Sequence, residues 1–250
     1  MNAGCLARSH LCPPMERTMK TCIRVTFALA LLCAAMSTAA FASSMYIVQG
    51  IPGRTFAAAT DPAFPVDVLL NDEACSQHGL AFGAVTGPLT FLPGTYNLKI
   101  SIANTLAPCT NTPMIDSEVT IDARTDISVV TTLTADGTPT LLTFTNNLMP
   151  VAANMSRVLF AQAVGALAVQ VVVQDTSTMK TYTYTVAPGA LLDVTLPAGN
   201  YTVAVNEGTT ALVGATQLTL SSQSVNLLYA IGRVKNNTVV LETKVLRDVI

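Results

Sequence analysis

The chain of 250 residues contains one phrase twice, as TFLPGTYNLKI at residues 90–100 and as TLPAGNYTVAV at residues 195–205. In each copy a proline, which has no backbone N–H, ends one strand, and a glycine that tolerates positive φ makes the turn. A tyrosine then starts an alternation of apolar and polar residues, the pattern of a half-buried strand. A tyrosine in this place can bury its ring and donate its hydroxyl to the corner backbone. The residues that define the two turns are Pro93, Gly94, Tyr96, Pro197, Gly199 and Tyr201.

The segments that precede the two copies also correspond. FPVDVLLND at residues 64–72 matches LAVQVVVQD at residues 167–175. A repeat of this length indicates a tandem duplication of one domain. The connection at 145–156 is punctuated by Asn and Pro, so we set the boundary at Pro150 and expect domains at 43–149 and 150–250. The connection is short, so the two domains are expected to touch.

Short apolar runs rich in Val, Thr, Ile and Leu alternate with Gly, Pro, Asn and Asp throughout both domains. This pattern predicts an all-β fold, and the strand spacing is typical of Ig-like or transthyretin-like β-sandwiches. No long amphipathic helix is expected. The expected strands are 45–51, 64–71, 88–92, 95–103, 117–122, 126–134, 140–145, 156–163, 167–175, 180–186, 190–196, 200–207, 215–220, 224–232 and 237–246.

The N-terminal segment reads as a leader rather than as part of the fold. Residues 19–42 carry Lys20 and Arg24, then an apolar run, and end in Ala40-Phe41-Ala42, the small-x-small pattern before a signal-peptidase site. We therefore predict that residues 1–42 are a cleaved signal peptide, with a misassigned extension before Met15 or Met19. A retained membrane anchor is the alternative, and the apolar run is short for it. We therefore predict that the protein is exported, either to the periplasm or out of the cell. After cleavage no membrane span is expected.

Charge and cysteine content agree with export. The chain has 13 Lys and Arg against 15 Asp and Glu, and the leader holds more basic than acidic residues. The remaining chain is therefore acidic, which argues against nucleic acid as a partner. Two cysteines lie outside the leader, Cys75 and Cys109. In an exported chain such a pair most simply forms one disulfide, here between two stretches that read as loops.

Few residues outside the leader suggest chemistry. His78 lies near Cys75 in a stretch that reads as a loop, so a Cys–His dyad is one interpretation, but a disulfide would remove the thiolate. Asp116, Glu118 and Asp122 share one face of an expected strand. Clustered carboxylates can bind Ca²⁺, but a solvated strand face is the favoured interpretation. We expect no catalytic residues, no metal and no cofactor.

FPVDVLLND at residues 64–72, then the Phe82-Gly83 pair, then TFLPGTYNLKI at residues 90–100 follow one another in the first unit. This order resembles the DUF4397 family of exported bacterial domains, which often occur in tandem and have no known function. Gln170 stands in the second unit where the family pattern has Asp, and IVQGIPG departs from the family's usual His-containing segment. The corresponding residues of the first unit are Pro65, Asp67, Val68, Asn71, Phe82, Gly83, Leu92, Pro93, Gly94 and Tyr96. The resemblance implies a β-sandwich and export, and no reaction.

The expected function is that of an exported, non-catalytic interaction or structural module with an envelope protein or a polysaccharide as partner. A carbohydrate-binding module is the alternative, since Tyr182 and Tyr184 share one strand face and could stack on a sugar. An ordinary inward face is the favoured interpretation of the same two rings. A self-assembling surface subunit is a further alternative, because Ala/Val/Thr-rich edge strands invite pairing.

Overall fold

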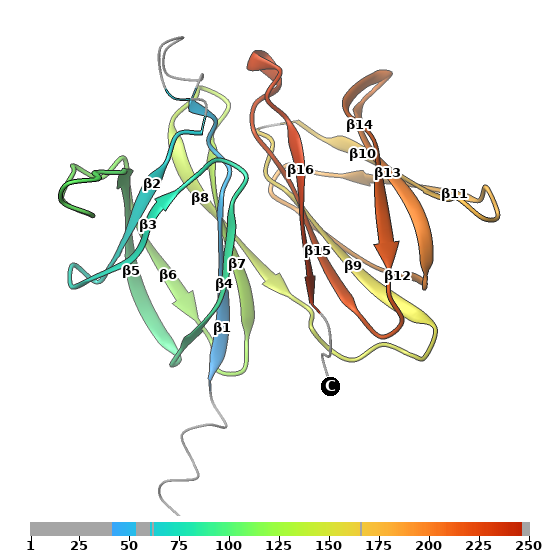
Figure 1. Cartoon of the computed structure of the whole chain (residues 1–250), viewed down its shortest axis with the longest axis horizontal. Coiled ribbons are helices and arrows are strands. Elements are labelled where there is room, and N and C mark those ends of the chain that lie inside the picture. The colour runs from blue at the N-terminus through green and yellow to red at the C-terminus, as the bar shows by residue number, and fades with distance from the viewer. Residues whose placement is uncertain (1–41, 54–60, 62, 166, 247–250) are drawn as a thin grey trace, which may run out of the picture. The chain divides into compact units, whose positions relative to one another are not determined.

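The computed structural model describes residues 42–53, 61, 63–165 and 167–246, and these residues form an all-β fold (Figure 1). Strands account for most of them, and η3 (Val234–Asn236) is a short 3₁₀ turn. No helix among the described residues is long and apolar enough to cross a membrane. The predicted signal peptide lies outside the described residues except for Ala42, its last residue.

The strands fall into two halves of the chain. In the first half the sheet orders are β4-β1-β7-β8 and β3-β2-β5-β6. Its strands are β1 (Ser43–Gln49), β2 (Val66–Leu70), β3 (Ala74–Leu80), β4 (Val85–Phe91), β5 (Gly94–Ile102), β6 (Ile115–Ile121), β7 (Asp126–Leu133) and β8 (Pro139–Asn146).

The second half repeats this arrangement, with the orders β12-β9-β15-β16 and β11-β10-β13-β14. Its strands are β9 (Met155–Gln162), β10 (Val169–Asp175), β11 (Thr181–Val186), β12 (Leu191–Pro197), β13 (Gly199–Glu207), β14 (Thr210–Leu220), β15 (Val225–Ile231) and β16 (Val240–Leu246).

Strand pairing repeats in detail between the two halves. All the pairs are antiparallel except β1 with β7 and β9 with β15, which are parallel and take the same place in each half. Each of these first strands ends in a buried glutamine, Gln49 or Gln162. Gln49 donates to the carbonyl of Phe64 at 2.9 Å, and Gln162 donates to that of Leu167 at 2.7 Å. The two amides thus hold the same connection in both halves.

Each half has its own hydrophobic core between its two sheets. Strands with alternating patterns supply it, as in β10, where Val169, Val171 and Val173 are buried while Gln170 is exposed. In the first half Val66, Val68, Leu98 and Ile100 have no exposed surface. The alternation in sequence is therefore the physical cause of the sandwich layers.

A third core joins the two halves. It is built from the outward faces of β1, β7, β9 and β15, so these strands are buried on both sides. Within it the hydroxyls of Ser128 and Tyr229 are 2.8 Å apart, and Thr132 donates to the carbonyl of Ala163 at 2.6 Å. The described residues from Ala42 onward therefore form one compact unit. The division into independent domains near Pro150 stays a prediction.

All fifteen expected strands are present, with ends shifted by a few residues. The expectation of a loop around Cys75 and His78 was wrong, because both lie on strand β3, ACSQHGL. This strand lies at a sheet edge and is mostly exposed, so it carries few of the β-branched and aromatic residues by which strands are recognised.

Candidate functional site

The repeated turns lead from one sheet of each half to the other. Tyr201 is buried and donates its hydroxyl to the carbonyl of Pro197 at 2.8 Å. Tyr96 donates to the carbonyl of Leu92, also at 2.8 Å, and packs edge-on against Phe91 with ring centroids 5.0 Å apart. The two turns therefore use the same hydrogen bond, and the ring is half-exposed in the first half only. Both hydroxyls thus hold the corner of their turn.

The cysteine pair lies at disulfide distance. The sulfur atoms of Cys75 and Cys109 are 2.17 Å apart and 34 positions separate them in sequence. The bond joins strand β3 to the long connection between β5 and β6, residues 103–114. Since both sulfurs are bonded to each other, neither is a thiolate that could pair with His78 as a nucleophile.

A buried carboxylate holds the same connection, and the sequence reasoning missed its role. Asp67 of β2 has no exposed surface. One of its oxygens accepts from the backbone N–H of Asn104 at 3.1 Å and from that of Cys109 at 2.8 Å. The other contacts the backbone N–H of Gly79 at 3.0 Å and His78 Nδ1 at 2.7 Å. Both oxygens are thus occupied by structural hydrogen bonds.

These bonds set the acidity of Asp67. Burial alone would raise its pKa, but the hydrogen bonds from the backbone of Cys109, Asn104 and Gly79 and from His78 outweigh burial and lower the pKa below its usual range. The carboxylate is therefore ionised under ordinary conditions and acts as an anchor. A signal for this role was present in the sequence, where Asp67 alternates with two core valines of a strand and Gln170 stands at the equivalent place in the repeat.

The acidic strand is an exposed face. Asp116 and Glu118 lie on β6 and Asp122 just beyond it, and all three are exposed. Asp116 accepts from Asn97 at 2.7 Å and lies 3.7 Å from Lys99. Within the described part of the chain, no three His, Cys, Asp or Glu residues gather closely enough to hold a metal ion. The arrangement therefore fits a solvated strand face.

Strand β14 takes the place of β6 in the second half, at the edge of its sheet, and differs from β6 in length and charge. It runs for 11 residues, against 7 for β6, and its sequence TALVGATQLTL has no charged residue. Among the described strands it pairs with β13 alone, so its other edge presents free N–H and C=O groups. The register shifts fall in its first part, and Thr216–Leu220 pairs regularly. The outer edge of β14, centred on residues 216–220, is the candidate interaction edge.

The registers identify matched positions on the two edges. In the second half Thr219 pairs with Asn200, the residue after the turn glycine. In the first half Thr120 pairs with Thr95, which also follows the turn glycine. By the same count Gln217 of β14 takes the place of Glu118 of β6. A charged edge resists pairing with another strand and an uncharged one permits it. The acidic residues of β6 therefore account for the difference between the two edges.

Tyr182 and Tyr184 do share one face of edge strand β11, as the spacing requires. Both rings are half-buried and pack against the core of the second half. Lys180 lies 4.8 Å from the ring centre of Tyr182. Burial raises the pKa of the Tyr184 hydroxyl. The two tyrosine rings thus belong to an inward face of the sandwich and remain partly exposed at the sheet edge.

Residues 54–172 match the model of DUF4397, a domain of unknown function, which confirms the resemblance found in the sequence. The match runs across the expected boundary at Pro150 and ends inside β10. No curated protein matches the chain.

Two solved structures show weak similarity. One is a leucine-rich repeat protein from Bacteroides thetaiotaomicron, with 13% identity, a TM-score of 0.24, and coverage of 76% of this chain and 26% of that one. The other is the TIE protein of Bacillus anthracis, with 10% identity, a TM-score of 0.26, and coverage of 82% and 34%. The chain therefore spans about a third or less of each, and likenesses this weak carry no argument.

Proposed function

We propose that the protein is an exported, non-catalytic interaction module that joins its partner through the candidate interaction edge on β14. The single observation that carries the proposal is that the edge of β14 is long, uncharged and unpaired, whereas the equivalent edge strand β6 is charged. Strand addition gives affinity through main-chain hydrogen bonds and specificity through alternate side chains. The disulfide supports export, because such bonds persist in oxidising compartments.

The state of the polar groups supports a non-catalytic role. A general acid or base needs a free proton position within reach of a substrate. The buried carboxylate of Asp67 has hydrogen bonds to both oxygens, and Cys75 is bonded to Cys109. Robust turnover by the purified protein in a hydrolase screen, at constant specific activity through purification, would overturn this part of the proposal.

The binding test is a sedimentation assay with envelope and exopolysaccharide fractions of the producing organism. We expect saturable binding to an envelope protein fraction that survives salt, because an uncharged edge gains little from electrostatics. Gln217→Lys combined with Thr219→Lys places two charges on the regular part of β14 and is expected to abolish binding. Thr120→Lys, at the position that matches Thr219, is the control and should bind normally.

Each other outcome has a definite meaning. Binding that is unchanged in the β14 variant excludes strand addition at this edge. Retention by polysaccharide alone, lost in Tyr182→Ala with Tyr184→Ala, would favour the carbohydrate-binding alternative. Light scattering over a concentration series tests the self-assembling alternative, since two copies of an uncharged strand can pair with each other. A monomer that binds no fraction contradicts the proposed function.

A further inference from the structure

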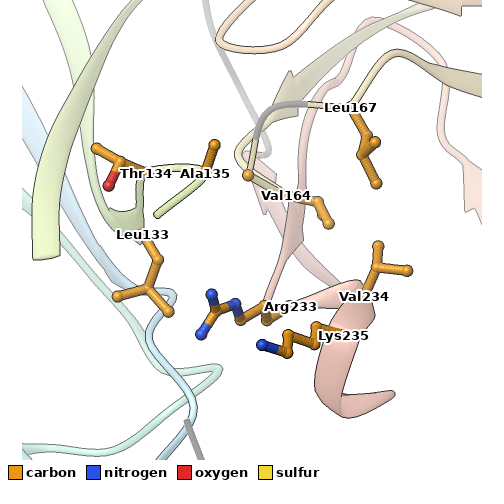
Figure 2. Close-up of a pocket in the computed structure, with 10 residues that line it drawn as sticks. Leu133, Thr134, Ala135, Val164, Leu167, Arg233, Val234 and Lys235 are labelled. Carbon is orange, nitrogen blue, oxygen red and sulfur yellow. The ribbon is translucent and has the colours of Figure 1, made fainter. Parts of the chain in front are cut away.

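A cavity of about 200 Å³ lies where three connections of the chain come together (Figure 2). The turn after β7 forms one wall, and the segment between β15 and β16 with η3 forms another. Val164, Gly165 and Leu167, between β9 and β10, form a third. It is separate from the candidate interaction edge on β14, none of whose residues line it. Cys75, Cys109 and Asp67 do not line the cavity either.

Most of the lining is aliphatic. Leu133 and Val164 are almost fully buried, and Leu167 and Val234 are half-buried. In Figure 2 these four side chains surround the space from both halves of the chain. A surface of this kind is favourable for alkyl groups because they leave water on entering it.

Two cations complete the lining, Arg233 and Lys235, and both extend into the space in Figure 2. Among the described residues neither head group makes an ion pair or a side-chain hydrogen bond. The backbone beneath them is fixed, since Arg233 N–H donates to the hydroxyl of Thr238 at 3.1 Å and Thr238 N–H donates back at 3.2 Å. The backbone that carries Arg233 is thus held, while the described residues offer its head group and that of Lys235 no ion-pair partner.

The facing turn leaves room for the guanidinium and does not neutralise it. A Cβ built on Gly137 would lie 3.0 Å from Arg233 Nη2, so a glycine there lets the guanidinium approach the turn. Asp136 is the acid of this turn, and its carboxylate accepts instead from the hydroxyls of Thr134 and Thr138. These hydrogen bonds lower the pKa of Asp136, so its charge is already stabilised within its own turn.

We propose that this cavity binds a small organic monocarboxylate with a short aliphatic chain. Its carboxylate would accept hydrogen bonds from the planar guanidinium of Arg233, the geometry in which arginine binds carboxylates best. Lys235 adds a second positive charge. The chain of the ligand would lie against Leu133, Val164, Leu167 and Val234. The volume is below the roughly 300–1,000 Å³ of sites for drug-sized ligands, which selects a small molecule.

Isothermal titration calorimetry on the purified protein tests this with butyrate, hexanoate and hexanamide. Each added methylene buried in the cavity is expected to tighten binding about fourfold, until the space is filled. Hexanamide has the same chain without the charge and is expected to bind at least about tenfold more weakly than hexanoate. Equal binding of hexanoate and hexanamide, or no detectable binding of hexanoate at millimolar concentration, overturns the proposal.

Variants locate the site. Arg233→Met keeps the length of the aliphatic stem and is expected to weaken hexanoate binding about tenfold or more, while Arg233→Lys keeps part of the affinity. Lys235→Met is expected to have a smaller effect, because Lys235 is more exposed. Lys244→Met removes a charge from β16 outside the cavity and is the control.

Folding of each variant is checked by circular dichroism. If Arg233→Met fails to fold, the affinity of Lys235→Met for hexanoate and the comparison of hexanoate with hexanamide test the proposal instead. Affinity unchanged in every foldable cavity variant would show that the carboxylate binds elsewhere, and the assignment of this site would be wrong. A loss of equal size in Lys244→Met would show a general charge effect and overturn it as well.

Discussion

The two halves of the molecule share one strand order and differ in how they connect the edge of one sheet. In the first half, β5 and β6 are joined by residues 103–114, which fold over β2. In the second half, β13 and β14 are joined by residues 208–209 alone. Asp67 is buried under the long connection, whereas Gln170 at the equivalent place is exposed. The comparison teaches that the charge is present where a loop brings backbone N–H groups to it.

The same difference affects the sheet edges. The short turn lets β14 extend to 11 residues, while β6 has 7 and carries two acids. One half is thus closed by a disulfide, a buried carboxylate and a charged edge, and the other ends in an edge able to pair. The first half therefore has the additional stabilising contacts, and the second half has the longer, uncharged edge.

The largest expected effect comes from removing the disulfide with Cys75→Ala and Cys109→Ala together. The bond spans 34 positions, and in the chain-entropy model a loop of this size contributes about 4 kcal/mol to the free energy of unfolding. Urea unfolding measures the loss. Hydrogen exchange should show increased opening of β3 and residues 103–114, with β9–β16 little changed. A loss below about 1 kcal/mol would mean that Asp67 alone holds the connection.

Asp67→Asn should be the next most destabilising change. The amide nitrogen would face N–H donors that now point at a carboxylate oxygen, and leaving such buried groups unpaired costs about 3 kcal/mol. Gln170→Asn is the matched control on an exposed position, and we expect its effect to stay within about 0.5 kcal/mol. Equal effects of the two substitutions in urea unfolding would contradict the contrast between the halves.

The acidity of Asp67 predicts a dependence of stability on pH. Its pKa is lowered in the folded state, so the ionised carboxylate stabilises the fold at pH above the ordinary Asp value of about 4. This stabilisation is lost as pH falls from that value through the lowered pKa. Urea unfolding from pH 6 downward should therefore show a decline that is reduced in Asp67→Asn. Parallel curves for the two proteins would refute this assignment.

The smallest expected effects concern the two turn tyrosines. Tyr201→Phe removes a hydrogen bond from a buried ring and should cost about 1 kcal/mol. Tyr96→Phe should cost about half of that, because water can reach the carbonyl of Leu92 once the hydroxyl is gone. Thermal unfolding of the two variants side by side is the measurement. A larger loss of stability in Tyr96→Phe than in Tyr201→Phe would show that the hydrogen bond at the exposed corner contributes more.

Strand positions were predictable because alternation of apolar and polar residues is a local property. The repeated turn was predictable for the same reason, since Pro, Gly and Tyr act within a few residues of each other. Strand β3 was missed because it pairs with β2 at an exposed sheet edge and has few of the β-branched and aromatic residues by which strands are recognised. The anchoring role of Asp67 was missed because its partners come from residues 79, 104 and 109.

By itself, the sequence determined the all-β class, the duplication and the choice of cysteines, because each depends on spacing along the chain. Only the tertiary structure decided that the halves share a third core, that β14 is an unpaired edge, and that Arg233 and Lys235 meet the apolar wall of one cavity. Those features depend on which surfaces face each other. Residues far apart in sequence are brought together there by packing that no local pattern encodes.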